Sequence, residues 1–220
     1  MIKAIIFDMD GVLFDSQRIH FEAEKRTVAN FGGKITDSEL KGYLGWNEEA
    51  FWEDVIRRCH LKTTVEELEQ YERPRLEKMM ESALKKDEAL GDLLSYLRNR
   101  KIRLAVASSA DRHLVGMILG KLGITRFFDA VVTGEDVKRS KPAPDIFLEA
   151  AKRIRVAPKD CIVVEDAPAG IEAAKRAGMH PIALRGSVNK GLDLTGAERE
   201  IADLNGLPGI IGFLGAKPSV

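Results

Sequence analysis

Ile5-Ile6-Phe7-Asp8-Met9-Asp10-Gly11-Val12 is the stretch from which the fold of this chain can be inferred. The short apolar run 2–7 predicts a buried strand that ends in two carboxylates, one residue apart. Asp8 and Asp10 then lie at the carboxyl end of a strand, where open α/β sheets bind ligands. Two neighbouring acids repel each other unless a positive charge lies close, and Mg²⁺ is the usual partner of such oxygens. On this segment alone a solvated turn is the alternative, because Asp and Gly are common turn residues.

Composition and charge are typical of a soluble globular protein. The chain has 220 residues, which suits one large domain or a domain that carries a smaller one. Lys and Arg number 34, as do Asp and Glu, so no net charge favours nucleic acid or an anionic membrane as partner. No run is long enough to span a bilayer, and the first residues do not resemble a signal peptide. Cys59 and Cys161 are far apart, which argues against a disulfide framework or a zinc site. We expect a cytoplasmic protein, monomeric by default.

Residues 15–83 predict a small helical domain inserted after the first strand. Apolar residues recur at helical spacing over about 15–30 and again over about 47–59. A third helix should follow a capping box that begins at Thr64, and Pro74 should kink or split it. Because the insertion leaves and rejoins the chain near the paired acids, we expect it to act as a cap that selects the substrate.

Short apolar strands alternate with helices after the insertion, which is typical of right-handed βαβ units. The expected strands are 102–107, 130–133, 161–164, 180–184 and a weak edge strand at 199–202, and the expected helices are 90–100, 112–122, 145–153, 169–177 and 207–214. The predicted fold class is therefore α/β: a Rossmann-like parallel sheet core in 1–14 and 84–220, carrying the small α-helical cap 15–83.

Reactive side chains follow four of the expected strands. Because parallel strands gather their carboxyl ends along one edge, these loops should meet in one pocket. In chain order the residues are Asp8, Asp10, Ser108, Lys141, Glu165 and Asp166. The set fits phosphoryl transfer: carboxylates hold Mg²⁺, an Asp attacks phosphorus to form an aspartyl-phosphate, and an ammonium and a hydroxyl bind the phosphoryl oxygens. Asp10 can protonate the leaving oxygen and later accept a proton from water.

These residues also resemble the four motifs of the haloacid dehalogenase superfamily, most of all its β-phosphoglucomutase-like branch. The matching segments are Asp8-Met9-Asp10-Gly11-Val12, Ser108, Lys141-Pro142 and Glu165-Asp166. The segments after Lys141 and Asp166, and a helical cap between the first two motifs, match that branch as well. The resemblance covers nearly the whole chain and is weakest in the cap and at the end.

The resemblance implies a role for each matching residue. Asp8 would be the nucleophile and Asp10 the general acid and base. Mg²⁺ would be held by Asp8, the backbone carbonyl of Asp10 and Asp166, and Glu165 would be either a further metal ligand or a hydrogen-bonding neighbour of the ligands. The transferring phosphoryl group would be bound by Ser108, Ser109 and Lys141.

The cap separates a phosphatase from a sugar phosphomutase, which must also hold a second phosphate. In the mutases that this chain resembles, a cap Arg and a cap Lys meet that phosphate. The comparable stretch here, 42–49, has neither, and Glu48 and Glu49 would repel a phosphate, although Arg73 and Arg75 can compensate in part. We therefore favour hydrolysis of a small phosphomonoester, such as a sugar or polyol phosphate. A sugar phosphomutase is the alternative, and a non-catalytic binding protein on the same fold is a second one.

Three further residues are candidates for substrate contact. His20 lies on the first cap helix, where packing or exposure explains it equally well. Trp46 is a candidate contact to the leaving group. Arg112 begins the helix after Ser108 and is a candidate for contact with a phosphate. Ser108 itself has a simpler reading as a residue that starts a helix.

Overall fold

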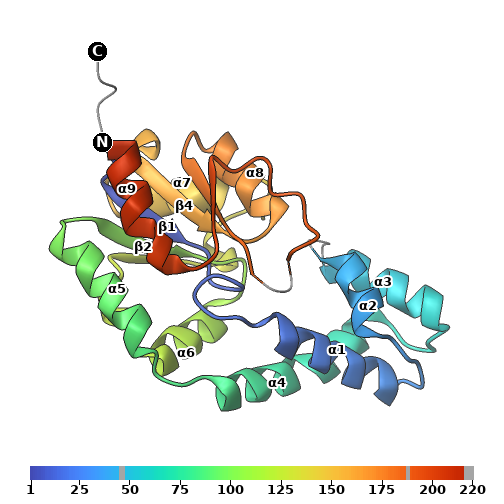
Figure 1. Cartoon of the computed structure of the whole chain (residues 1–220). Helices are drawn as coiled ribbons and strands as arrows, with labels where there is room; N and C mark the ends of the chain where they lie inside the picture. The colour runs from blue at the N-terminus through green and yellow to red at the C-terminus, as the bar shows by residue number, and fades with distance from the viewer. Residues whose placement is uncertain (45–47, 187–188, 216–220) are drawn as a thin grey trace. The chain divides into compact units, whose positions relative to one another are not determined.

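A computed structural model of the chain describes residues 1–44, 48–186 and 189–215 (Figure 1). Its strands form one parallel sheet in the order β3-β2-β1-β4-β5-β6. Their bounds are β1 Ala4–Phe7, β2 Arg103–Ala107, β3 Ala130–Val132, β4 Cys161–Glu165, β5 His180–Leu184 and β6 Arg199–Ile201. The predicted α/β class with a parallel sheet is confirmed, including the weak edge strand.

Helices cover both faces of this sheet, as Figure 1 shows. Helices α7 and α8 pack against one face and against each other, and α5 packs on the other face over β2. The bounds are α5 Glu88–Asn99, α6 Arg112–Leu122, α7 Asp145–Arg153, α8 Pro168–Arg176 and α9 Leu207–Gly215. Single 3-10 turns lie at Thr125–Phe127, Gly134–Asp136, Pro158–Asp160 and Leu204–Gly206.

Strand β1 is buried on both faces, which explains its uninterrupted apolar sequence. Ala4 and Ile6 belong to the apolar cluster that contains Phe147 of α7. Because side chains alternate along a strand, Ile5 and Phe7 point to the opposite face, and all four are fully buried. Burying residues on both faces is the pattern that a central parallel strand requires.

The strand order places a topological switch point between β1 and β4. From β1 the chain proceeds outward through β2 and β3, and then returns to β4 on the other side of β1. The loops after β1 and β4 therefore diverge at neighbouring strand ends and leave a crevice, which is where open α/β sheets bind ligands.

The chain divides into two compact units, one formed by Met1–Phe14 with Lys85–Val220 and the other by Asp15–Leu84. The second unit is helical: α1 Gln17–Asn30, α2 Asp37–Leu40, a 3-10 turn Lys41–Tyr43, α3 Glu48–Cys59 and α4 Val65–Ala83. Of the two effects expected of Pro74, the split is wrong, since α4 runs through Pro74 without a break, and the kink stays a prediction. Its packing on α1, with Leu68 and Met80 fully buried on either side of the proline, compensates for the missing hydrogen bond.

Over the described part of the chain, no helix combines the length and the apolar character needed to cross a bilayer.

Candidate active site

Asp8 is buried at the switch point. In the register of the sheet Phe7 lies beside Val106 on one side and Val164 on the other, and the backbone N–H of Asp8 donates to the Val164 carbonyl at 2.9 Å. The residue keeps only 7% of its surface exposed. A carboxylate at this position has lost most of its water and must find partners in the protein.

Lys141 supplies the main partner. Its ammonium donates to Asp8 Oδ1 at 2.6 Å and to Glu165 Oε1 at 2.6 Å, and it contacts the Ala107 carbonyl at 3.4 Å. The lysine lies in the loop between β3 and α7, so one buried cation joins that loop to the ends of β1, β2 and β4. These side chains therefore lie at one edge of the sheet, which is where the sequence predicts that they meet.

Glu165 uses both carboxylate oxygens within the protein. While Oε1 accepts from Lys141, Oε2 accepts from the backbone N–H groups of Asp166 and Ala167 at 2.9 and 3.0 Å. The side chain is 1% exposed. Of the two roles left open by the sequence, these bonds favour a residue that holds Lys141 and the loop after β4.

Two glycines make room for these carboxylates. A Cβ on Gly170, in the first turn of α8, would overlap the carboxyl group of Glu165. A Cβ on Gly11 would overlap the carboxyl group of Asp166, and Gly11 also has a φ of 74°, a conformation that favours glycine. Any side chain larger than that of glycine at positions 11 and 170 would therefore displace a carboxyl group of the site.

Asp166 is held from a loop that the sequence analysis did not single out. The Asn189 side-chain amide donates to the Asp166 carbonyl at 2.8 Å and to the Leu184 carbonyl at 2.9 Å. Asn189 is buried and follows β5, so it fastens the loop after β4 to the next strand. The signal for this role is a polar residue buried at the end of a strand. The sequence does not show that Asn189 is buried, so it could not reveal this role.

The cluster carries more negative charge than Lys141 can balance. Burial raises the pKa of Asp8 well above its usual value, the charges of Glu165 and Asp10 add to this, and Lys141 opposes it. Burial, followed by the charge of Glu165, raises the pKa of Asp166 to about 7. Burial alone would lower the pKa of Lys141, but the two carboxylates outweigh it and raise that pKa above the ordinary value.

The donor set fits a hard divalent cation. Carboxylate oxygens of Asp8, Glu165 and Asp166 lie within 4.8 Å of one another and are largely buried. The charge of Asp10 contributes to the raised pKa of both Asp8 and Asp166, so this fourth carboxyl group lies near them. Oxygen ligands with excess negative charge are what Mg²⁺ binds in proteins.

Ser108 lies at the end of β2, next to the strand that carries Asp8. It is 1% exposed, and its hydroxyl accepts a hydrogen bond from the Ala110 N–H at 3.1 Å. That bond leaves the hydroxyl proton available for donation. Ser109 is exposed, and α6 begins three residues later at Arg112.

Arg112, His20 and Trp46 are the remaining candidates from the sequence. The Arg112 guanidinium donates to Asp136 at 2.7 Å, so a contact to phosphate stays a prediction. His20 lines a cavity inside the helical unit. Trp46 falls in the segment 45–47, which is outside the described residues.

Comparison with known proteins decides the family. Residues 5–184 match the model of the haloacid dehalogenase-like hydrolases. The chain belongs to this family. The resemblance seen in the sequence is thereby confirmed, and with it the prediction of an enzyme of the hydrolase class. The match spans β1 to β5 and includes every residue of the cluster around Lys141 except Asn189.

Individual members of the family are similar over most of their length. The phosphorylated carbohydrates phosphatase of Thermotoga maritima is 30% identical over 181 residues, which cover 82% of this chain and 84% of that protein. The beta-phosphoglucomutase of Bacillus subtilis is 33% identical over 213 residues, or 92% of each chain. A crystal structure of a haloacid dehalogenase-like protein of unknown function from Agrobacterium tumefaciens has a TM-score of 0.83 and 29% identity, covering 98% of this chain and 100% of that one.

A methyl group added at position 170 tests whether Gly170 packs closely against Glu165. Gly170→Ala should lower the free energy of unfolding by about 1–3 kcal/mol, because the Glu165 carboxyl group must shift and strain its bonds to Lys141. Gly116→Ala, in the exposed middle of α6 with open space around it, should raise stability by up to about 1 kcal/mol. Urea unfolding of both variants measures the difference, and an equal gain in both would show that Gly170 has room for a side chain.

Proposed function

We propose that this protein is a Mg²⁺-dependent phosphatase that hydrolyses a small phosphomonoester, such as a sugar or polyol phosphate, through an aspartyl-phosphate on Asp8. The observation that carries the proposal is the buried cluster at the switch point, in which Lys141 pairs with Asp8 while Asp166 and Asp10 lie close. Membership of a hydrolase family and the similarity to a phosphatase of phosphorylated carbohydrates support it. We also infer a cytoplasmic monomer, in keeping with two free cysteines.

Asp8, Asp166 and the backbone carbonyl of Asp10 are the groups that would hold Mg²⁺. When bound, the ion neutralises phosphate oxygens, so that an anionic carboxylate can approach an anionic phosphate. Glu165 is placed beside this set to fix Lys141, since its oxygens already accept three hydrogen bonds. Lys141, held in this way, keeps its positive charge beside the reacting carboxylate of Asp8.

In the first step an Asp8 carboxylate oxygen forms a bond to phosphorus, and the bond between phosphorus and the ester oxygen breaks. Asp10, in its protonated form, gives its proton to the departing alcohol oxygen. Lys141 and the Ser108 hydroxyl bind the phosphoryl oxygens as charge shifts onto them. The products of this step are the alcohol and the aspartyl-phosphate.

In the second step a water molecule attacks phosphorus and gives one proton to the Asp10 carboxylate. The bond between phosphorus and the Asp8 oxygen breaks, which releases inorganic phosphate and restores the Asp8 carboxylate. Asp10 is then protonated again and ready for the next substrate. One carboxyl group therefore moves the proton in both halves of the reaction.

Phosphomutase activity is the competing function, because the beta-phosphoglucomutase of Bacillus subtilis is similar over 92% of this chain. A mutase must hold a second phosphate away from the metal. The described residues that line the cavity beside His20 include Glu24, Glu48 and Glu72 but neither Lys nor Arg. Carboxylates repel a phosphate, so this cavity does not suit the second phosphate of a mutase.

The parent protein should release p-nitrophenol from p-nitrophenyl phosphate with Mg²⁺ and lose this activity with excess EDTA. Asp8→Asn should lower kcat by more than about a thousandfold, because an amide cannot attack phosphorus. Asp92→Asn, an exposed position on α5, is the matched control and should behave like the parent. Equal turnover by the Asp8 variant, or none by the parent with Mg²⁺, would contradict the proposal and favour a binding protein.

Asp10→Asn separates proton transfer from metal binding. We expect kcat to fall by about a hundredfold or more, because an amide neither donates nor accepts the proton. The affinity for Mg²⁺, measured by calorimetry, should change by less than about tenfold, since the backbone of Asp10 and not its side chain is the proposed ligand. A complete loss of Mg²⁺ binding in this variant would refute the division of roles.

A further inference from the structure

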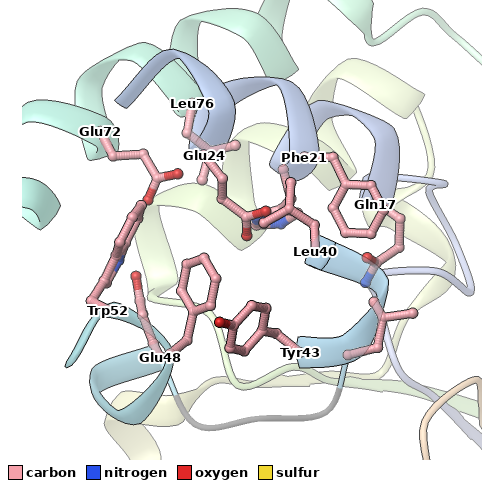
Figure 2. A pocket seen from close by; sticks show the side chains of 12 residues that line it. Gln17, Phe21, Glu24, Leu40, Tyr43, Glu48, Trp52, Glu72 and Leu76 are labelled. Atoms are coloured by element: carbon pink, nitrogen blue, oxygen red, sulfur yellow. The ribbon is translucent and has the colours of Figure 1, made fainter. Parts of the chain in front are cut away.

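The helical unit contains a cavity of about 250 Å³ whose lining is acidic and aromatic (Figure 2). Glu24 extends into it from α1, Glu48 from the start of α3 and Glu72 from α4. Figure 2 shows Trp52 bordering the same space between Glu72 and Glu48. Three carboxyl groups from three helices thus face one space.

Several polar atoms at this cavity are buried and lack a hydrogen-bond partner within the described structure. They are Glu24 Oε2, Glu72 Oε1 and Trp52 Nε1. Glu72 is 5% exposed and Trp52 is 1% exposed, so water meets little of either side chain. Leaving such groups unpaired is costly, and a ligand that pairs with them regains that free energy on binding.

Neither Glu24 nor Glu72 has a positive charge beside it that lowers its pKa. Burial, followed by the charges of Glu24, Glu48 and Glu69, raises the pKa of Glu72 to about 8. Burial and the charge of Glu48 raise the pKa of Glu24 to about 7.

Glu48 lies at the exposed rim of the cavity. Partial desolvation and the charge of Glu69 raise its pKa, and Arg73 opposes the shift. Arg73 thus offsets the charge at the rim, while His20 and Tyr43 are the other titratable groups among the lining residues. The inner carboxyl groups of Glu24 and Glu72 keep no such cation beside them in the lining.

Aromatic rings complete the wall. The rings of Tyr43 and Phe51 lie 5.0 Å apart, and those of Phe51 and Trp52 lie 4.6 Å apart, measured between centroids. The Tyr43 hydroxyl donates to Asp54 and accepts from Arg58, and the Arg58 guanidinium also lies 5.7 Å from the centroid of the Tyr43 ring. Faces of aromatic rings attract cations.

We propose that this cavity binds a protonated amine, and that the substrate is a phosphomonoester whose alcohol part carries an amino group and at least one hydroxyl. The ammonium donates to Glu24 and Glu72 over the aromatic wall, and the hydroxyl accepts from Trp52 Nε1. The substrate class rests on the proposed function, whereas the amine site itself does not.

Other ligand chemistries match the lining less well. A second phosphate would meet three carboxylates in a lining that contains neither Lys nor Arg. A neutral polyol can satisfy Trp52, but it brings no charge to balance the buried acids. A protonated amine supplies charge and several N–H donors together, as the Lys ammonium does elsewhere in this chain.

Matched pairs of phosphomonoesters that differ in one amino or hydroxyl group test the substrate class. Suitable pairs are glucosamine 6-phosphate with glucose 6-phosphate, and serinol phosphate with glycerol 1-phosphate. In at least one pair kcat/KM should favour the amine by about tenfold or more. Glu72→Gln should remove most of that preference, while Glu66→Gln, exposed on the same helix, should keep both the preference and the turnover of p-nitrophenyl phosphate. Equal or better use of the hydroxyl compound in every pair overturns the proposal.

Calorimetry with the phosphate-free amines tests the site without turnover. Binding of glucosamine, serinol or ethanolamine to the parent at pH 7 should release protons, seen as a dependence of the heat on buffer ionisation, because a bound ammonium lowers the pKa of Glu72 and Glu24. Affinity should rise from pH 6 to pH 8, as long as the amine stays protonated. Glu72→Gln should weaken binding and reduce the proton release. Absence of binding for all three amines would overturn the site.

The pH dependence of stability shows whether the Glu72→Gln variant is folded like the parent. A carboxyl group whose pKa is raised on folding stabilises the protein at low pH, and that stability is lost as pH rises from about 4.5 to about 8. Glu72→Gln should therefore unfold at higher urea concentration than the parent at pH 8.5, with little gain at pH 5.

Failure of p-nitrophenyl phosphate hydrolysis would reject the phosphatase and leave the amine-binding result to stand by itself.

Discussion

The buried ammonium of Lys141, held between Asp8 and Glu165 at 2.6 Å each, is the interaction on which the site depends. Two carboxylates from neighbouring strand ends would repel each other without it. A single buried cation joins the ends of β1 and β4 to the loop before α7 and fixes the orientation of Asp8. Removing one partner of such a network leaves a buried charge unpaired, which costs more than the pair itself contributes. The site is therefore stable only as a complete set.

This constraint extends into the backbone around the cluster. Glu165 can accept from Lys141 and from two backbone N–H groups only because Gly170 offers no side chain where the carboxyl group lies. Gly11 does the same for Asp166, and Asn189 fastens the loop that carries it. Lys141 pairs with Asp8 and Glu165 only, and the charges of Asp166 and Asp10 add to theirs, so negative charge is left over. Binding of a divalent cation is the simplest way to balance it.

Much of this arrangement could be predicted from the sequence because it follows from the sheet. Asp8, Lys141 and Asp166 each follow a strand, and parallel strands bring their ends to one edge, so spacing along the chain was enough to group them. The predicted strand and helix positions agree with the structure to within a few residues for the same reason: apolar runs and capping residues are local signals.

Features that depend on the packing of distant residues could not be predicted from the sequence. Asn189 acts through where its loop returns after β5, and the choice between two roles for Glu165 depended on which of its oxygens were already bonded. Glu24 and Glu72 are 48 residues apart in the chain and meet only because α1 packs on α4. Pro74 likewise stays within one helix because that contact supports it.

The two acidic clusters differ in how their charge is balanced. The cluster in the sheet already contains a lysine and offers closely spaced oxygens, which suits a small hard cation. The cluster in the helical unit lies against aromatic rings and has unpaired atoms of both hydrogen-bond types, which suits an organic ammonium. Metal and amine are therefore assigned to different parts of the chain by the character of their surroundings.

The central claim is most directly tested by a crystal structure of the protein grown with Mn²⁺ in place of Mg²⁺, using anomalous scattering to locate the ion. We expect one strong peak in contact with the carboxylates of Asp8 and Asp166, with Lys141 still paired to Asp8 and Glu165. A peak confined to the carboxyl groups of the helical unit, or no peak at the end of β1 under saturating Mn²⁺, would contradict it.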